Sequence, residues 1–177
     1  MKSSEKTKLI LNKLRKEAQD RDLIYIEELQ FGSGVNRCDF FTLHPHPSKG
    51  YETIVYEIKV SKQDFKNDTE RKQRNARLYA DYFYYVTPSN LIKAEKIPLW
   101  AGLIEYDLNK LLKKKIINAP YHSKARPSWE LVVSIIRNSK DVQRDTRLLR
   151  YALNQCQHDL EKLRKVQKDN WKSYSLK

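Results

Sequence analysis

Residues 51–88 constrain the fold more than any other part of the sequence. Residues 51–60 are rich in β-branched and aromatic side chains and predict a long strand. Ser61, followed three residues later by an aspartate, is typical of a helix start, and a mostly polar helix is expected over 62–79. Residues 81–88 predict a second aromatic strand, ended by proline. A strand–helix–strand step with a long crossover implies at least one parallel pair in a mixed sheet.

The remaining N-terminal residues predict further elements of the same sheet. Apolar positions at helical spacing predict a helix over 4–20, and β-forming runs separated by glycine and proline predict three more strands, over 22–31, 37–43 and 100–106. We therefore expect an α/β fold with a mixed sheet, in the order αβββαβ, flanked by helices.

The chain changes character after residue 112. Residues 113–127 are predicted to be a basic connector, 128–138 a helix, and 141–168 a helix whose apolar positions recur every seven residues. We expect two domains, residues 1–112 and a basic helical extension over 113–177. The apolar seam packs on its own chain or joins two copies in a homo-oligomer; its members are Val142, Leu149, Leu153, Cys156, Leu160 and Leu163.

The formal net charge is +13 and is concentrated in the extension, where 16 Lys and Arg face 6 Asp and Glu from residue 113 onward. A basic excess of this size favours a polyanionic partner, nucleic acid first. Arg144 and Arg147 belong to a series of basic residues at helical spacing and are candidates for DNA contacts. The alternative is a solvated basic surface.

Other partners and compartments are less compatible with the sequence. No apolar run approaches the roughly 18 residues needed to span a bilayer, and the N-terminus does not resemble a secretory signal. The two cysteines, Cys38 and Cys156, are far apart, which argues against a disulfide framework and a Cys-rich zinc site. We expect no membrane partner and a cytoplasmic location.

A candidate site lies at the end of the strand over 51–60. Glu57 and Lys59 are two residues apart, so their side chains share a face of the strand, and a hairpin with residues 37–43 would bring Asp39 to them. Two carboxylates suit Mg²⁺, which activates bound water and stabilises charge on a phosphodiester. The lysine can orient that water or offset the developing charge. The alternative for Glu57 and Lys59 is an ordinary surface ion pair.

The pattern Asp39…Glu57-Ile58-Lys59, in this order of elements, resembles the PD-(D/E)XK nuclease superfamily. The surrounding sequence segments are similar to those of its MmcB-type DNA-repair branch and phage-borne relatives, over roughly residues 5–107. These segments are Arg37-Cys38-Asp39-Phe40, YEIKVSKQDF over 56–65, the aromatic stretch 79–88, and Ile97-Pro98 ahead of Gly102-Leu103-Ile104. Cys38 stands where the name-giving motif has proline, at a position that varies in the superfamily.

The resemblance implies a restriction-endonuclease-like core and a Mg²⁺- or Mn²⁺-dependent DNA nuclease, acting in DNA repair or in phage and host DNA processing. It implies that Asp39 and Glu57 bind the metal, with the Ile58 carbonyl as a further ligand, and that Lys59 is the catalytic lysine. Some members add an upstream glutamate, for which Glu28 is the candidate.

The helix that follows the site carries further candidates for phosphate contacts. They are Lys62, Lys66, Arg71, Lys72 and Arg74. A charged helix face that is only solvated is the alternative. Two other functions stay open: a DNA-binding module that keeps the fold without cleaving, and an oligomeric interaction protein built on the C-terminal helix.

Overall fold

The computed structural model describes residues 2–31, 37–110 and 112–138, together with 155, 157, 158, 160–164 and 167. The chain divides into two compact units, residues 1–139 and 140–177. In the second unit the described residues are helical and exposed. The predicted DNA contacts Arg144 and Arg147 lie outside the described residues, as do the seam positions Val142, Leu149, Leu153 and Cys156.

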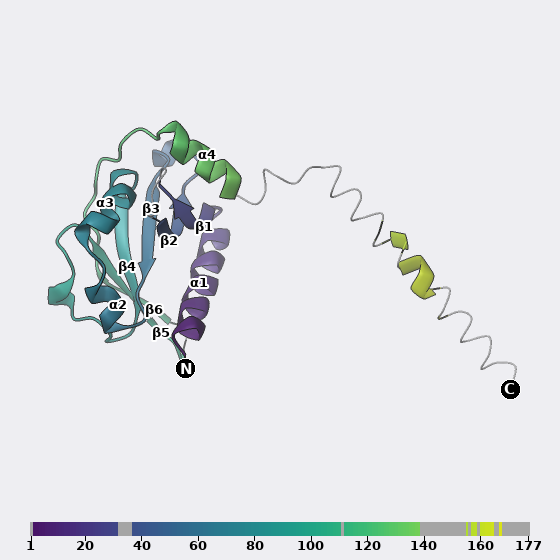
Figure 1. Ribbon diagram of the computed structural model, residues 1–177, viewed down its shortest axis with the longest axis horizontal. Coiled ribbons are helices and arrows are strands. Elements are labelled where there is room, and N and C mark those ends of the chain that lie inside the picture. The colour runs from purple at the N-terminus through teal and green to yellow at the C-terminus, as the bar shows by residue number, and fades with distance from the viewer. Residues whose placement is uncertain are drawn as a thin grey trace, which may run out of the picture. The chain divides into compact units, whose positions relative to one another are not determined.

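The first unit is an α/β structure built on a six-stranded mixed sheet in the order β1-β2-β3-β4-β5-β6 (Figure 1). Neighbours pair antiparallel except for the two parallel pairs, β3 with β4 and β4 with β5. The predicted parallel pair within a mixed sheet is therefore confirmed. The strands are β1 (Ile24–Gln30), β2 (Arg37–Leu43), β3 (Thr53–Ile58), β4 (Tyr82–Pro88), β5 (Gly102–Asp107) and β6 (Leu112–Ile117).

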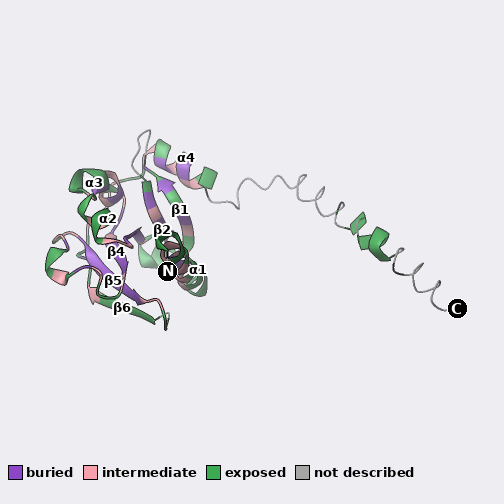
Figure 2. Ribbon diagram, turned by 60° about the horizontal axis from the view of Figure 1, so that its bottom comes forward, coloured by how far each residue is buried: buried purple, intermediate pink, exposed green. Residues whose placement is uncertain are grey.

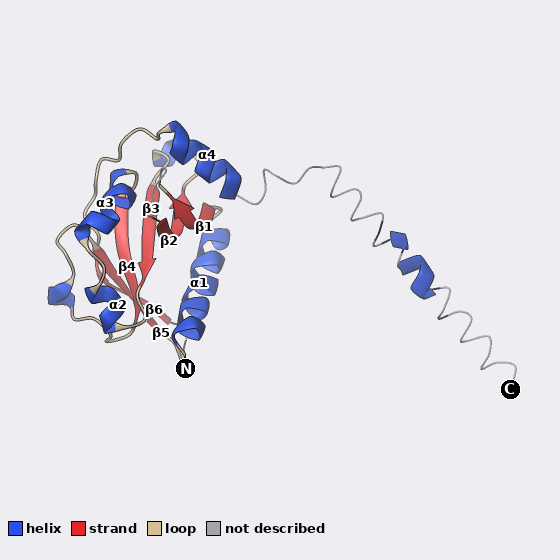
Figure 3. Ribbon diagram, viewed as in Figure 1, coloured by secondary structure: helices blue, strands red, loops and turns tan. Residues whose placement is uncertain are grey.

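Helices cover both faces of this sheet (Figure 3). We call the faces the α1 face and the α3 face, after the helix that packs on each. The helices are α1 (Ser3–Asp20), α2 (Lys62–Lys66), α3 (Glu70–Leu78) and α4 (Trp129–Asn138), with two short 3-10 turns, η1 (Pro47–Lys49) and η2 (Ala94–Lys96). No helix within the described ranges is long and apolar enough to cross a membrane.

Each face has its own apolar core because side chains alternate along the strands. On the α1 face, Ile10 and Leu14 of α1 pack with Tyr56 and its neighbours. On the α3 face, Ala76 of α3 and Leu131 of α4 pack with strand residues such as Val55. The helices keep an exposed outer side while β4 and β5 are buried throughout most of their length (Figure 2). Most residues of the central strands are thus buried, as is usual for parallel strands.

The boundary predicted after residue 112 is in the wrong place. Residues 112–117 form β6, which pairs antiparallel with β5, and the compact unit extends to residue 139. Three consecutive lysines, Lys113, Lys114 and Lys115, led us to expect a connector. Lysine is also a residue that protects an exposed edge strand from pairing with other chains, which explains its presence on β6.

The helix predicted over 62–79 is interrupted. Its start is confirmed, because Ser61 Oγ accepts a hydrogen bond from the N–H of Asp64 at 3.1 Å and α2 begins at Lys62. The helix then stops at Asn67, and Thr69 caps α3 by accepting from the N–H of Lys72. Side chains of this kind compete with the helical backbone and favour caps. The interruption leaves Asp68 between the two helices.

Gly102 is required by close packing. An added Cβ would lie 2.4 Å from Tyr84 Cε1 and 2.6 Å from the backbone nitrogen of Ala119. The tyrosine ring could shift, but the backbone atom could not do so without moving the chain. We therefore expect Gly102→Ala to lower the free energy of unfolding by about 1–3 kcal/mol, measured by urea denaturation. Since Gly→Ala at an unstrained site is usually stabilising, a variant as stable as the wild type would contradict this packing.

Candidate active site

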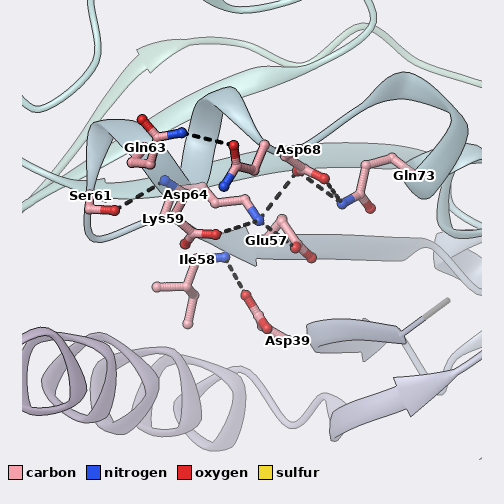
Figure 4. Close-up of polar contacts among 10 residues, drawn as sticks. Asp39, Glu57, Ile58, Lys59, Ser61, Gln63, Asp64, Asp68 and Gln73 are labelled. Carbon is pink, nitrogen blue, oxygen red and sulfur yellow. Dashed lines mark hydrogen bonds and ion pairs between the residues drawn. The ribbon is translucent and has the colours of Figure 1, made fainter. Parts of the chain in front are cut away.

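Asp39 and Glu57 come together because β2 and β3 form the predicted hairpin. Phe40 of β2 pairs with Tyr56 of β3 in antiparallel register, which brings Asp39, the residue before Phe40, alongside Glu57, the residue after Tyr56. Asp39 Oδ2 accepts a hydrogen bond from the backbone N–H of Ile58 at 2.7 Å (Figure 4). Burial raises the pKa of Asp39, and the hydrogen bond from Ile58 opposes that rise. The carboxylate is therefore held in one orientation at the end of β3.

Glu57 is a buried carboxylate with an unused oxygen. Its residue is 7% exposed, and Oε1 accepts a hydrogen bond from Lys59 Nζ at 2.9 Å. Oε2 is buried and has no hydrogen-bond partner among the residues that the structure describes. Burial, followed by the nearby charge of Asp39, raises the pKa of Glu57 to about 7. An unpartnered buried carboxylate oxygen is costly unless another group, such as a cation, occupies the space beside it.

Lys59 is buried among three carboxylates, and we call this group the Lys59 cluster. Its Nζ lies 2.9 Å from Glu57 Oε1, 3.4 Å from Asp68 Oδ2 and 3.8 Å from Asp64 Oδ1 (Figure 4). Burial alone would lower the pKa of this ammonium, but the three carboxylates outweigh it and the pKa is raised. Lys59 is therefore protonated at neutral pH. The surface ion pair considered as an alternative does not describe this buried arrangement.

Asp68 was not anticipated from the sequence. Its side chain is 1% exposed and accepts two hydrogen bonds from Gln73 Nε2, at 2.9 and 3.0 Å. It also bonds to Tyr85, whose pKa is raised by burial and then by Asp68. The only signal in the sequence is the run of cap-forming residues Asn67, Asp68 and Thr69 inside a predicted helix. The sequence predicted one continuous helix through that run, so it indicated neither the break nor the contact with Lys59.

Glu28 lies near the site without joining it. Its carboxylate pairs with Arg37 and is half exposed, and its charge contributes to the raised pKa of Asp39. Glu27 points to the α1 face, where it pairs with Arg15. No contact between Glu28 and the carboxylates of Asp39 or Glu57 is found in the described part of the chain.

The backbone at Glu28 is unusual. Its φ is +56°, a left-handed conformation that residues other than glycine seldom adopt. The distortion interrupts the alternation of β1, so that Ile26 and Leu29, three residues apart, both join the core of the α3 face. Such distortions cost of order 1–3 kcal/mol and are frequent at functional sites.

The residues present fit a hard divalent cation. Asp39 and Glu57, together with Asp64 and Asp68, provide four carboxylates for one buried ammonium, so the site has an excess of negative charge. Across the described ranges, no group of three or more His, Cys, Asp or Glu side chains is arranged to hold a metal ion by itself. Mg²⁺ commonly binds through one or two carboxylates and keeps several waters. Asp39 and Glu57 could meet that smaller requirement.

The predicted phosphate-binding residues of the first unit are exposed on the two helices that follow Lys59. Lys62 and Lys66 belong to α2, and Arg71, Lys72 and Arg74 belong to α3. His44 and His46 lie in the loop before η1, where His46 is 3.9 Å from Asp22. They do not contribute to the Lys59 cluster.

Comparisons with known proteins establish the fold alone. No protein-family profile matches the chain, and no curated protein does. Among solved structures, a protein of unknown function from Silicibacter pomeroyi is similar with a TM-score of 0.59 and 22% sequence identity. The match covers 85% of this chain and 92% of that one. The arrangement of helices and sheet therefore occurs in another protein, and the function has to be inferred from the site.

The raised pKa of Glu57 predicts a pH dependence of stability. Between pH 4.5, the ordinary pKa, and about 7, the folded protein keeps a proton that the unfolded chain has released. Without divalent cations the free energy of unfolding should therefore fall as pH rises through this window, by up to about 3 kcal/mol. Urea denaturation at several pH values measures the effect. Glu57→Gln should lose this part of the pH dependence, and Glu95→Gln, an exposed control, should keep it.

If the free energy of unfolding changes with pH in the same way in the wild type and in Glu57→Gln, this would contradict the raised pKa of Glu57.

Proposed function

We propose that this chain is a Mg²⁺- or Mn²⁺-dependent nuclease that hydrolyses phosphodiester bonds in DNA. The observation that carries the proposal is the buried carboxylate of Glu57 next to Asp39: its Oε1 accepts a hydrogen bond from Lys59, and its Oε2 has no partner within the described ranges. These are the three residues through which the sequence resembles the PD-(D/E)XK superfamily.

Asp39 and Glu57 would hold the cation. When bound, it would supply an activated water and stabilise charge on the phosphodiester. The hydrogen bond from the Ile58 N–H fixes one oxygen of Asp39 and leaves the other for a ligand. Glu57 must release its proton to bind, and a pKa of about 7 allows this near neutral pH.

Lys59 would act as a cation rather than as a base. Its raised pKa keeps the ammonium protonated, so it is suited to offset charge that develops on the scissile phosphate. Asp68, which accepts hydrogen bonds from Gln73, contacts the same ammonium and helps to position it. The basic side chains of α2 and α3 follow directly in the sequence and supply a surface for the DNA backbone.

The burial of Lys59 favours a second candidate function. At 5% exposure, with three carboxylates around it, its ammonium is not free to meet a phosphate in this conformation. A DNA-binding module that keeps the fold and the ion pair without cleaving would need no such access. The two functions differ in whether DNA is cut when a divalent cation is present.

Plasmid nicking distinguishes them. We expect wild-type protein to nick supercoiled DNA in Mg²⁺ or Mn²⁺ and not in EDTA, and Asp39→Asn or Glu57→Gln to abolish the activity. Lys59→Ala should lose about 10²–10⁴-fold in rate, the range for a positioned catalytic group, with little change in DNA affinity measured in EDTA.

Glu95→Gln removes an exposed carboxylate outside the site and should cut like the wild type. Thermal unfolding of each variant separates loss of the site from loss of the fold. DNA binding without any metal-dependent nicking by the wild type would favour the non-cleaving module. Nicking that persists in Asp39→Asn and Glu57→Gln would exclude these residues as the metal site.

A further inference from the structure

The α1 face of the sheet carries an open groove of about 380 Å³ that is lined by strand and loop residues. Tyr56, Tyr82 and Tyr84 line it, together with the basic side chains Arg21, Lys113 and Lys115. The side chain of Glu57 points to the α3 face, the same face as Val55, because side chains two residues apart on a strand share a face. The groove is therefore separate from the candidate active site.

Three tyrosines point to the α1 face because β3 and β4 are parallel and in register, and of these Tyr56 and Tyr84 are each 6% exposed while Tyr82 is half-buried. Tyr56 pairs with Tyr84, and their rings are stacked with centroids 6.1 Å apart and planes 20° apart. Tyr82, two residues before Tyr84, points to the same face and meets the ring of Tyr121 at 5.8 Å. Tyr121 is 65% exposed, so the rings that solvent can reach are Tyr82 in the groove and Tyr121 beside it.

The charged side chains around these rings favour an anion. Three cations line the groove, and Glu52 is the carboxylate among the lining residues. Lys113 is already paired with Glu17. Lys115 instead lies over the ring of Tyr84, 5.3 Å from its centroid, and no carboxylate is within ion-pair distance of it or of Arg21 among the residues described. Two cations are thus available to a ligand.

We infer that this groove binds single-stranded DNA, with bases stacked on Tyr82 and Tyr121 and phosphates on Arg21 and Lys115. An aromatic surface between cations is the combination that binds unpaired strands, because every base has a face that can stack. Paired bases hide those faces inside the duplex. The groove is also open, so a polymer can pass through it where an enclosed pocket would admit only a small anion.

The inference rests on the proposed function for the choice of DNA as ligand, but it does not depend on cleavage. A strand held on the α1 face would stay clear of Glu57 and Lys59 on the other face. Binding can therefore be measured in EDTA, where the metal site is inactive. A protein that nicks DNA but does not bind through the groove, and one that binds but does not nick, are distinguishable.

The test is fluorescence anisotropy of a labelled oligothymidylate with the full chain in EDTA. Lys115→Glu should weaken binding at least about tenfold, and Tyr82→Ala about 5- to 100-fold, the range for loss of one stacked base. Lys114→Glu is the matched control, because it makes the same charge change on the same strand at an exposed residue that does not line the groove. It should bind within about twofold of the wild type, since only general attraction is reduced.

Equal weakening by Lys115→Glu and Lys114→Glu would overturn the inference and leave only general attraction to the basic surface. If Tyr82→Ala does not fold, Tyr121→Ala removes an exposed ring and provides the same test. Unchanged affinity in the folded tyrosine variant would also overturn it. So would displacement of the oligonucleotide by equal concentrations of inorganic phosphate or thymidine monophosphate, because the groove would then be a simple anion site.

Discussion

The buried ammonium of Lys59 is the interaction on which the arrangement of the site depends. It lies at the end of β3, where Glu57 comes from the strand itself and Asp64 and Asp68 come from the segment that follows. Without this cation, the buried carboxylates of Glu57 and Asp68 and the half-exposed carboxylate of Asp64 would repel one another. Even with it, Asp39 adds a further negative charge, and one oxygen of Glu57 has no hydrogen-bond partner in the described part of the chain. The negative charge of the site is thus only partly compensated, and a bound divalent cation would compensate the remainder.

The mixed sheet lies between the candidate active site on the α3 face and the groove on the α1 face. Alternation along β3 sends Val55 and Glu57 to the α3 face and Tyr56 to the α1 face, so adjacent residues face the candidate active site and the groove. Helices α2 and α3 lie on the α3 face, and Asp68 comes from the gap between these two helices. Helix α1 covers only part of the α1 face and leaves open the groove lined by Tyr56, Tyr82 and Tyr84.

The sequence predicted the framework better than the contacts. The crossover after Val60 and the aromatic run of β4 were enough to predict the parallel pair, because periodicity and capping residues are local signals. Strand β6 was missed because three lysines obscure its pairing with β5. The approach of Asp68 to Lys59 joins residues on either side of a helix break, so it depends on tertiary packing. The left-handed backbone of Glu28 is a property that its residue type does not indicate.

Isothermal titration calorimetry with Mn²⁺ tests the central claim most directly. Performed near pH 6.5 in two buffers of different ionisation enthalpy, it reports both affinity and the protons released on binding. Binding should release protons, because Glu57, with a pKa of about 7, must ionise to become a ligand. The double variant Asp39→Asn/Glu57→Gln should lose both the affinity and the proton release. Equal Mn²⁺ affinity in the wild type and the double variant would contradict the account.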